Sequence, residues 1–544
     1  RSVAFERVAG SEAEVRARHA EAEAFLAQGD TEKALGAAGK AVSKEPNNVE
    51  YLKYWVSVME KTRPLSPQAY QDRYVGMLME AKRRIARVQR TNRAAHEDVL
   101  VPVMQSLRYS NTDANSWNGL IKDAETAMGF YSDSAPEEAK DKAVLGRYRG
   151  IARVEQMRRG LQLTDDERAQ AKADLDAALK ADPALDDAAA ALAQWHLLGA
   201  VKAARDGQRD RVDQAVKDAT AALDAFLKVN PKGVQSVLAR LQLELNEVLK
   251  AAGPDSPLAQ RQAAMQPKID EALKALEAAD PATVDMAAAQ ELAQMAVASR
   301  LPGAVDRARA VFEKISAARP THPFPMIVLG DIWMYAGEAD LPKAIAQWQK
   351  VVDMPELPLS LEGLMLFRDK LEARMRQVNA QMQVAESSTG EARDAALKQA
   401  QAYRDAFEKE SPAGNAMMAL TDGRLAFLRG DLPEARRLLN QYVEQDRNNA
   451  AATRLLAEVM LRQGNLGAAR TQLERAVELN PSDVLAWRVL TEVLIKVNDF
   501  KKAQEAIGKA LALDPKNEQL LQQKASIDDM LAGDNAKDPV MRAL

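Results

Sequence analysis

The sequence of 544 residues contains no cysteine and only four histidines. Without cysteine there is no disulfide, no thiolate metal site and no cysteine nucleophile, although both a reducing cytosol and a periplasm allow this composition. The histidines never lie three or four residues apart, so they form no zinc-binding helix motif; they are His19, His96, His196 and His322. We therefore predict neither a metal site nor a cofactor.

Motifs of catalysis and nucleotide binding are also missing. The chain has no Gly-x-Ser-x-Gly elbow, and the pairs Gly39-Lys40 and Gly508-Lys509 lie inside expected helices, where alanine follows the lysine. The oxygen-rich residues 111–116 partly follow the spacing of a calcium loop, but Ser116 and Lys122 stand where glycine and a bidentate glutamate are needed. We predict a capped polar loop there, no catalytic residue, and a protein that is not an enzyme.

Neither long apolar runs nor an excess of one charge is present. No run approaches the roughly 18–20 apolar residues that span a bilayer. The 74 basic and 78 acidic residues nearly balance, which does not favour nucleic acid as a partner. The first residue is Arg1 rather than methionine, so any membrane contact is expected only from a segment that precedes it.

Alanine, by contrast, is abundant, at roughly one residue in five, while aromatic residues make up 5%. Alanine favours helices and lets them pack closely. The chain is also longer than the roughly 250–300 residues at which a single core stops growing. These features predict many close-packed helices and no strand.

The C-terminal third repeats with a period of 34 residues. Three sets of positions follow this spacing: Pro481 and Pro515; Ala435, Ala469 and Ala503; and Gly430, Gly464 and Asn498. The pattern predicts one antiparallel helical hairpin per period, with a turn at the glycine, a small residue buried between the two helices, and a proline that ends the second helix. Buried alanines at these positions would confirm the register.

This pattern resembles the tetratricopeptide repeat family. Trp487, Leu490 and Gly423 match positions of the first helix of the repeat, whereas Ala457 and Thr491 replace its glycine. The resemblance is strong over residues 416–530, good over 15–60 and 289–355, and degenerate over 150–288. It implies an all-α fold, an α-solenoid of antiparallel helix pairs wound as a right-handed superhelix, and a scaffold or assembly protein of bacterial type.

The sequence further predicts six segments and several helix starts. Residues 361–410 are expected to form two longer helices, and Thr164 with Glu167 and Ser134 with Glu137 have the spacing of capping boxes. The segments are N-terminal repeats (1–61), an atypical helical insert (62–148), degenerate repeats (149–288), central repeats (289–358), a long helical hairpin (359–411) and C-terminal repeats with a capping helix (412–544).

A cluster of basic residues lies within the atypical insert. Two interpretations stay open, an anionic partner and a solvated helix face, and the lack of nearby aromatic residues disfavours RNA. The cluster consists of Lys82, Arg83, Arg84, Arg87, Arg90 and Arg93.

In the tetratricopeptide repeat family, the first helix of each pair lines a concave groove for a peptide or a partner helix. Transferred by position, the resemblance implies a groove made by Arg424, Phe427, Arg454, Glu458, Leu461, Arg488, Glu492 and Ile495. Glu458 and Glu492 stand where some members carry asparagine and would repel a peptide carboxylate. The alternative is that these arginines and glutamates pair with one another.

The leading functional hypothesis is a non-enzymatic scaffold that binds a protein or peptide, or a second copy of itself, through this concave face. The alternative is a structural or assembly subunit of a bacterial cell-envelope complex, for pili, secretion or polysaccharide export, tethered by a segment before Arg1. For localisation this favours the envelope or periplasm over the cytoplasm. A catalytic site hidden in residues 62–148 is a third, weaker hypothesis.

Overall fold

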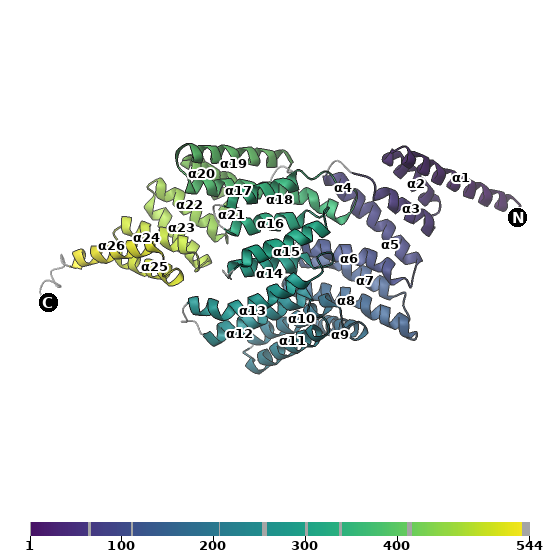
Figure 1. Ribbon diagram of the computed structural model, residues 1–544, viewed down its shortest axis with the longest axis horizontal. Helices are drawn as coiled ribbons and strands as arrows, with labels where there is room; N and C mark the ends of the chain where they lie inside the picture. The colour runs from purple at the N-terminus through teal and green to yellow at the C-terminus, as the bar shows by residue number, and fades with distance from the viewer. Residues whose placement is uncertain are drawn as a thin grey trace. The chain divides into compact units, whose positions relative to one another are not determined.

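The computed structural model describes residues 2–63, 67–109, 113–205, 207–252, 258–299, 303–336, 340–410 and 416–535. Within these ranges the chain is helical and contains no strand, and helices that follow one another pack as antiparallel pairs (Figure 1). None of the described helices has the length and apolar content needed to cross a membrane. The predicted all-α solenoid of helix pairs is confirmed.

The chain divides into two compact units, Arg1–Lys370 and Leu371–Leu544, and the boundary falls inside α18 (Leu361–Ser387). The first half of unit 1 contains α1 (Ser2–Ala27), α2 (Thr31–Lys44), α3 (Val49–Met59), α4 (Pro67–Arg73), the π-helix η1 (Tyr74–Leu78), α5 (Met79–Val88), α6 (Arg93–Tyr109), the 3₁₀-helix η2 (Ala114–Trp117), α7 (Asn118–Met128) and α8 (Pro136–Arg158).

The remainder of unit 1 contains α9 (Asp165–Ala181), α10 (Asp186–Arg205), α11 (Arg209–Val229), α12 (Val234–Ala252), α13 (Leu258–Ala278), α14 (Met286–Ala298), α15 (Ala304–Ala318), α16 (Phe324–Ala336) and α17 (Leu341–Val352). Unit 2 continues from α18 with α19 (Gly390–Glu410), α20 (Ala416–Arg429), α21 (Leu432–Gln445), α22 (Ala450–Arg462), α23 (Leu466–Leu479), α24 (Val484–Lys496), α25 (Phe500–Leu513) and α26 (Glu518–Asn535). The two longer helices predicted over 361–410 are therefore α18 and α19.

The turns of the unit 2 hairpins follow from local chemistry. Gly430 and Gly464 adopt φ of 84° and 77°, and Asn498, at the same place one period later, adopts 57°. Asparagine is among the few residues with a side chain that tolerate this left-handed conformation. The next helix then begins at an aspartate N-cap in two of the three cases, because Asp431 and Asp499 accept hydrogen bonds from Glu434 and Lys502 backbone amides.

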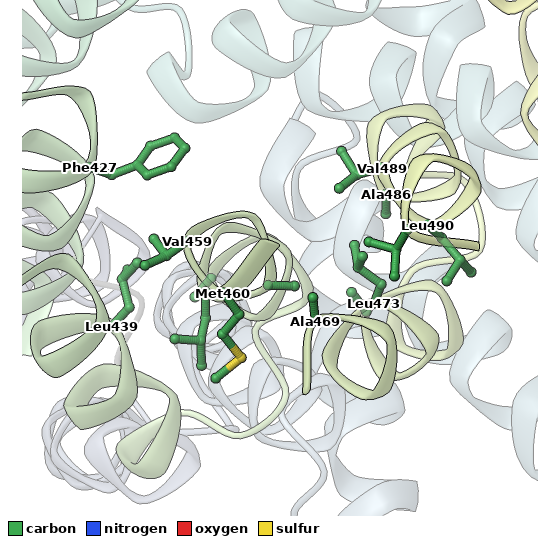
Figure 2. Packing of buried hydrophobic residues seen from close by; sticks show 14 of the residues in the cluster. Phe427, Leu439, Val459, Met460, Ala469, Leu473, Ala486, Val489 and Leu490 are labelled. Carbon is green, nitrogen blue, oxygen red and sulfur yellow. The ribbon is translucent and has the colours of Figure 1, made fainter. Parts of the chain in front are cut away.

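The alanines of the 34-residue repeat lie between the two helices of each hairpin. Ala435, Ala469 and Ala503 are each fully buried, which confirms the predicted register. Figure 2 shows Ala469 and Leu473 of α23 within the apolar core of unit 2. A buried leucine such as Leu473 contributes about 1.5–3 kcal/mol relative to an exposed one, and the small alanine allows the backbones to approach closely enough for that burial.

The central pair of unit 1 is organised around one tryptophan. Trp348 of α17 is fully buried, and its indole Nε1 donates a 3.1 Å hydrogen bond to the backbone oxygen of Ile327 in α16. A Cβ atom at Gly330 would lie 2.1 Å from that nitrogen, so only glycine fits there. Trp348 therefore packs α17 against α16.

A second contact in unit 1 joins segments nearly 300 residues apart in sequence. The Tyr70 hydroxyl donates to the Pro358 carbonyl oxygen at 2.5 Å, and the Ser360 backbone amide donates to the same hydroxyl at 2.8 Å. The first turn of α18 thereby covers the core formed by α3 to α5. No periodicity in the sequence indicated this closure.

One of the two predicted capping boxes is confirmed and the other is wrong. Thr164 caps α9 and exchanges hydrogen bonds with Glu167, as expected. At the other site the helix begins instead at Pro136 after Ala135, because proline is already fixed in helical φ at the first position of a helix. Within the oxygen-rich loop, residues 111 and 112 lie outside the described residues, and Asp113 caps η2.

Candidate interaction surface

The first helices of the unit 2 hairpins, α20, α22 and α24, place the predicted groove residues in three columns. Successive first helices touch one another, so positions 34 residues apart become neighbours. One column holds Arg454 and Arg488, the second Arg424, Glu458 and Glu492, and the third Phe427, Leu461 and Ile495. The sequence register therefore places the predicted residues on neighbouring helices, and their contacts differ from repeat to repeat.

Two of the three predicted arginines are held by ion pairs within unit 2. Arg424 pairs with Glu386 of α18 at 2.8 Å. Arg454 pairs with Glu458 on its own helix, and its Nε lies 3.2 Å from Asp483, the N-cap of α24. Arg424 thereby connects α20 to α18, and Arg454 connects α22 to the start of α24. Within the predicted set, Arg454 pairs with Glu458 on the same helix and not across repeats.

Glu458 lies at the centre of this charged row. Burial raises the pKa of its carboxyl, while Arg454 and Arg488 act in the opposite direction. A half-buried carboxylate between two arginines has its charge compensated inside the protein. It therefore offers little net charge to a partner.

The three apolar residues of the third column differ in burial. Phe427 is largely buried, at 8% exposure, and the Arg462 guanidinium lies 4.9 Å from its ring centroid. Leu461 and Ile495 are only partly buried against the core of unit 2. The apolar strip that remains available on α22 and α24 is therefore Leu461 with Ile495.

The third repeat carries the exposed charges of the predicted groove. Arg488 is exposed and forms no ion pair with the described residues. Glu492 is exposed as well, and its only described ion pair is a long one, 3.8 Å, to Lys496. Arg488, Glu492 and the Leu461–Ile495 strip together form what we call the α24 surface.

The basic cluster of unit 1 is mostly neutralised. Arg83 makes a double hydrogen bond to Asp123, and the others pair with Glu60, Glu80, Glu97 or Asp141, except Arg90, which stacks over Phe130. These contacts disfavour a site for an anionic partner. They favour the other interpretation, a helix face whose basic side chains pair with nearby acidic residues. No group of three or more potential metal ligands occurs among the described residues.

Unit 1 contains a hollow that no sequence motif indicated. A cavity of about 360 Å³ is lined by side chains of α6, α8, α10, α12 and α14, a set of alternate helices. Its apolar residues carry no motif, and they come from the segment where the repeat is degenerate. Only the tertiary arrangement reveals that they face one another.

The helix pairs, the buried small residues and the turns define an α-solenoid. A family model described as the tetratricopeptide repeat matches residues 426–493 and 460–527. Residues 426–527, from the end of α20 into α26, are thus tetratricopeptide repeats.

Among solved structures, the Cut9-Hcn1 heterotetramer of APC/C has a chain that is 12% identical, with 94% of this chain and 96% of that chain covered and a TM-score of 0.36. A tetratricopeptide repeat protein of Thermus thermophilus is 20% identical, with 38% and 99% covered and a TM-score of 0.30. The first repeat domain of Spaghetti (RPAP3), bound to the HSP90 peptide SRMEEVD, is 21% identical, with 22% and 95% covered and a TM-score of 0.21. Comparison with curated proteins gives no match.

Proposed function

We propose that this protein is a non-enzymatic scaffold that binds a partner protein or peptide, and that the α24 surface of unit 2 is one of its contact sites. The observation that carries this proposal is the contrast between repeats. Arg424 and Arg454 are held in internal ion pairs. Arg488, in contrast, is exposed and unpaired among the described residues, and it lies on α24 with the partly buried Ile495. Exposed charge beside an apolar strip is a common composition of protein interfaces.

The test uses charge reversal at the exposed position. We expect Arg488→Glu to remove a subset of partners identified by crosslinking mass spectrometry in lysate of the native organism. Lys509→Glu, on the outer helix α25, changes the net charge equally and is the matched control, since Lys509 is exposed and forms no ion pair with the described residues. Identical partner sets for Arg488→Glu and wild type would refute the α24 surface as a contact site.

Arg454 is unsuitable for such a test. Reversing its charge would place a third acidic group beside Glu458 and Asp483, so a lost partner could reflect a loosened helix packing. Arg488 forms no ion pair with the described residues, so Arg488→Glu breaks none, although it removes one of the two positive charges that act on Glu458.

The envelope-assembly function and self-association both stay predictions. Reading the gene upstream of Arg1 tests the first, because a signal peptide or a membrane helix there would favour it. Sedimentation of the purified chain over a range of concentrations tests the second.

A further inference from the structure

Two contacts of unit 1 join helices that are not neighbours along the solenoid. In a solenoid each repeat ordinarily contacts only the repeats beside it. Arg108 of α6, however, donates to Gln235 of α12 at 3.3 Å and lies 3.6 Å from Asp285 of α14. The second contact is made by residues 354–363, which connect α17 to the first turn of α18 and lie against α3 and α4. We call this segment the 354–363 strap.

One tyrosine hydroxyl holds the strap at two points. Tyr70 of α4 donates to the Pro358 carbonyl oxygen at 2.5 Å, and the Ser360 amide donates to the same hydroxyl at 2.8 Å. Gly363 lies so close that a Cβ atom there would be 1.7 Å from the hydroxyl oxygen. Tyr70 is fully buried, and because a buried polar group without a partner is costly, the hydroxyl stabilises the strap in this position.

Apolar side chains and one backbone hydrogen bond complete the contact. Leu359 is 1% exposed within the core of α3 to α5, and its amide donates to the Thr62 carbonyl oxygen at 3.1 Å. Residues 354–360 are neither helix nor strand, and they include Pro355 and Pro358, which have no amide hydrogen to donate. The position of the strap therefore depends on its contacts with α3 and α4.

Release of the strap would leave the helix pairs folded. The stability of a solenoid is nearly a sum of contacts between neighbours, so neighbouring pairs stay packed when a distant contact is lost. In the released state α5 would still be joined to α7 by the double hydrogen bond from Arg83 to Asp123, and α6 to α12 and α14 by Arg108. Release would therefore change the curvature of unit 1 and expose the apolar surface beneath Leu359.

We propose that the 354–363 strap is a conformational device that closes unit 1 and can release without unfolding the helix pairs, which gives unit 1 a closed and an open state. A contact held by a few hydrogen bonds and one buried leucine opens locally far more readily than the whole unit unfolds. The closed strap fixes the distance between α4 and the start of α18, and the open state relaxes it. This inference does not depend on the scaffold function, because its test requires no partner.

Hydrogen exchange of the Leu359 amide in the full chain tests the release. Tyr70→Phe removes the hydroxyl but keeps the Thr62 carbonyl that accepts this amide, so the amide exchanges faster only if the strap separates from α3. We expect exchange at least about tenfold faster, with the amides of α8 and α9 unchanged. Tyr131→Phe is the matched control, since Tyr131 is buried in unit 1 and its hydroxyl has no hydrogen-bond partner among the described residues. The control should leave the Leu359 amide unchanged.

A pair of spin labels measures the movement itself. The chain has no cysteine, so Arg63→Cys and Glu356→Cys introduce unique labelling sites at two exposed residues, one next to Thr62 and the other in the strap. We expect one narrow distance distribution in the labelled protein and an additional longer distance when Tyr70→Phe is added. Leu359→Ala removes the apolar side chain instead of the hydroxyl and should add the same longer distance. Circular dichroism should show equal helix content in all variants.

Three results would overturn the proposal. An unchanged Leu359 amide together with an unchanged distance in both variants would show that the strap does not release. Faster exchange that extends equally to α8 and α9, or a loss of helix content, would mean that unit 1 unfolds rather than opens. Equal acceleration in Tyr131→Phe and Tyr70→Phe would mean that any lost buried hydroxyl has this effect, which refutes the role of Tyr70.

Discussion

The carboxylate of Asp186 and the backbone amide of Ser236 form a hydrogen bond of 2.9 Å between two helices of unit 1. Asp186 is the first residue of α10, and its other oxygen accepts the amide of Gln235 at 3.0 Å. The aspartate thus caps α12, a helix other than its own. The neighbouring Gly233 has no room for a side chain, since a Cβ there would lie 2.7 Å from Asp186 Oδ1.

Removing this carboxylate should loosen the start of α12. We expect Asp186→Ala to cost about 1–2 kcal/mol, because it deprives two backbone amides of their acceptor. Hydrogen exchange of the amides of Gln235 and Ser236 measures the effect where it occurs. Asp165→Ala, at an exposed aspartate that begins α9, is the control and should leave those amides unchanged.

Enlarging a repeat alanine should disrupt the hairpin that contains it. Ala469 is fully buried in the core shown in Figure 2, so Ala469→Leu must displace its neighbours and should cost about 1–3 kcal/mol. Urea unfolding followed by circular dichroism measures the loss. Ala451→Leu, at an exposed position of α22, should change the midpoint little, and equal midpoints for the two variants would contradict the register.

Two helical glycines should respond to alanine in opposite directions. Gly330→Ala would bring a methyl group to 2.1 Å from Trp348 Nε1, and we expect a loss of several kcal/mol or failure to fold. At Gly467 of α23 an added Cβ atom would meet no other atom within 4 Å, so Gly467→Ala should stabilise by about 0.5–1 kcal/mol through helix propensity. Thermal unfolding of both variants gives the comparison, and similar melting temperatures would refute it.

The stability contribution of Glu458 should depend on pH. Burial raises the pKa of its carboxyl in the folded state, so the folded protein holds this proton more tightly than the unfolded chain. Stability therefore falls as pH rises from the ordinary glutamate pKa through the raised one. Glu458→Gln has no titratable group at this position. The unfolding free energy of the variant minus that of wild type should therefore increase from acidic to neutral pH.

Urea titrations at several pH values measure this difference, and Glu458→Ala should show the same trend with pH. A difference that stays constant would mean that the two arginines balance the burial of Glu458, and one that moves the other way would mean that they outweigh it.

Much of the fold was predictable from the sequence because the repeat encodes it locally. A glycine or asparagine at the turn, an alanine between the helices and a proline after them specify each hairpin, and the structure places Gly464, Ala469 and Pro481 accordingly. The candidate site was less accessible. The period identified which residues share the inner face of unit 2, yet whether Arg454 or Arg488 is available depends on where Asp483 and Glu458 lie in three dimensions.

The sequence by itself determined an all-α chain of paired helices, the register of its C-terminal repeats and the absence of familiar catalytic motifs, because all three depend on residues close together in the chain. Only the tertiary structure decided which charges are already paired, that Asp186 caps a helix 50 residues away, that Tyr70 joins Ser360, and that side chains of five alternate helices of unit 1 line one hollow. Those features arise from side chains far apart in sequence, and no periodic pattern specifies such contacts.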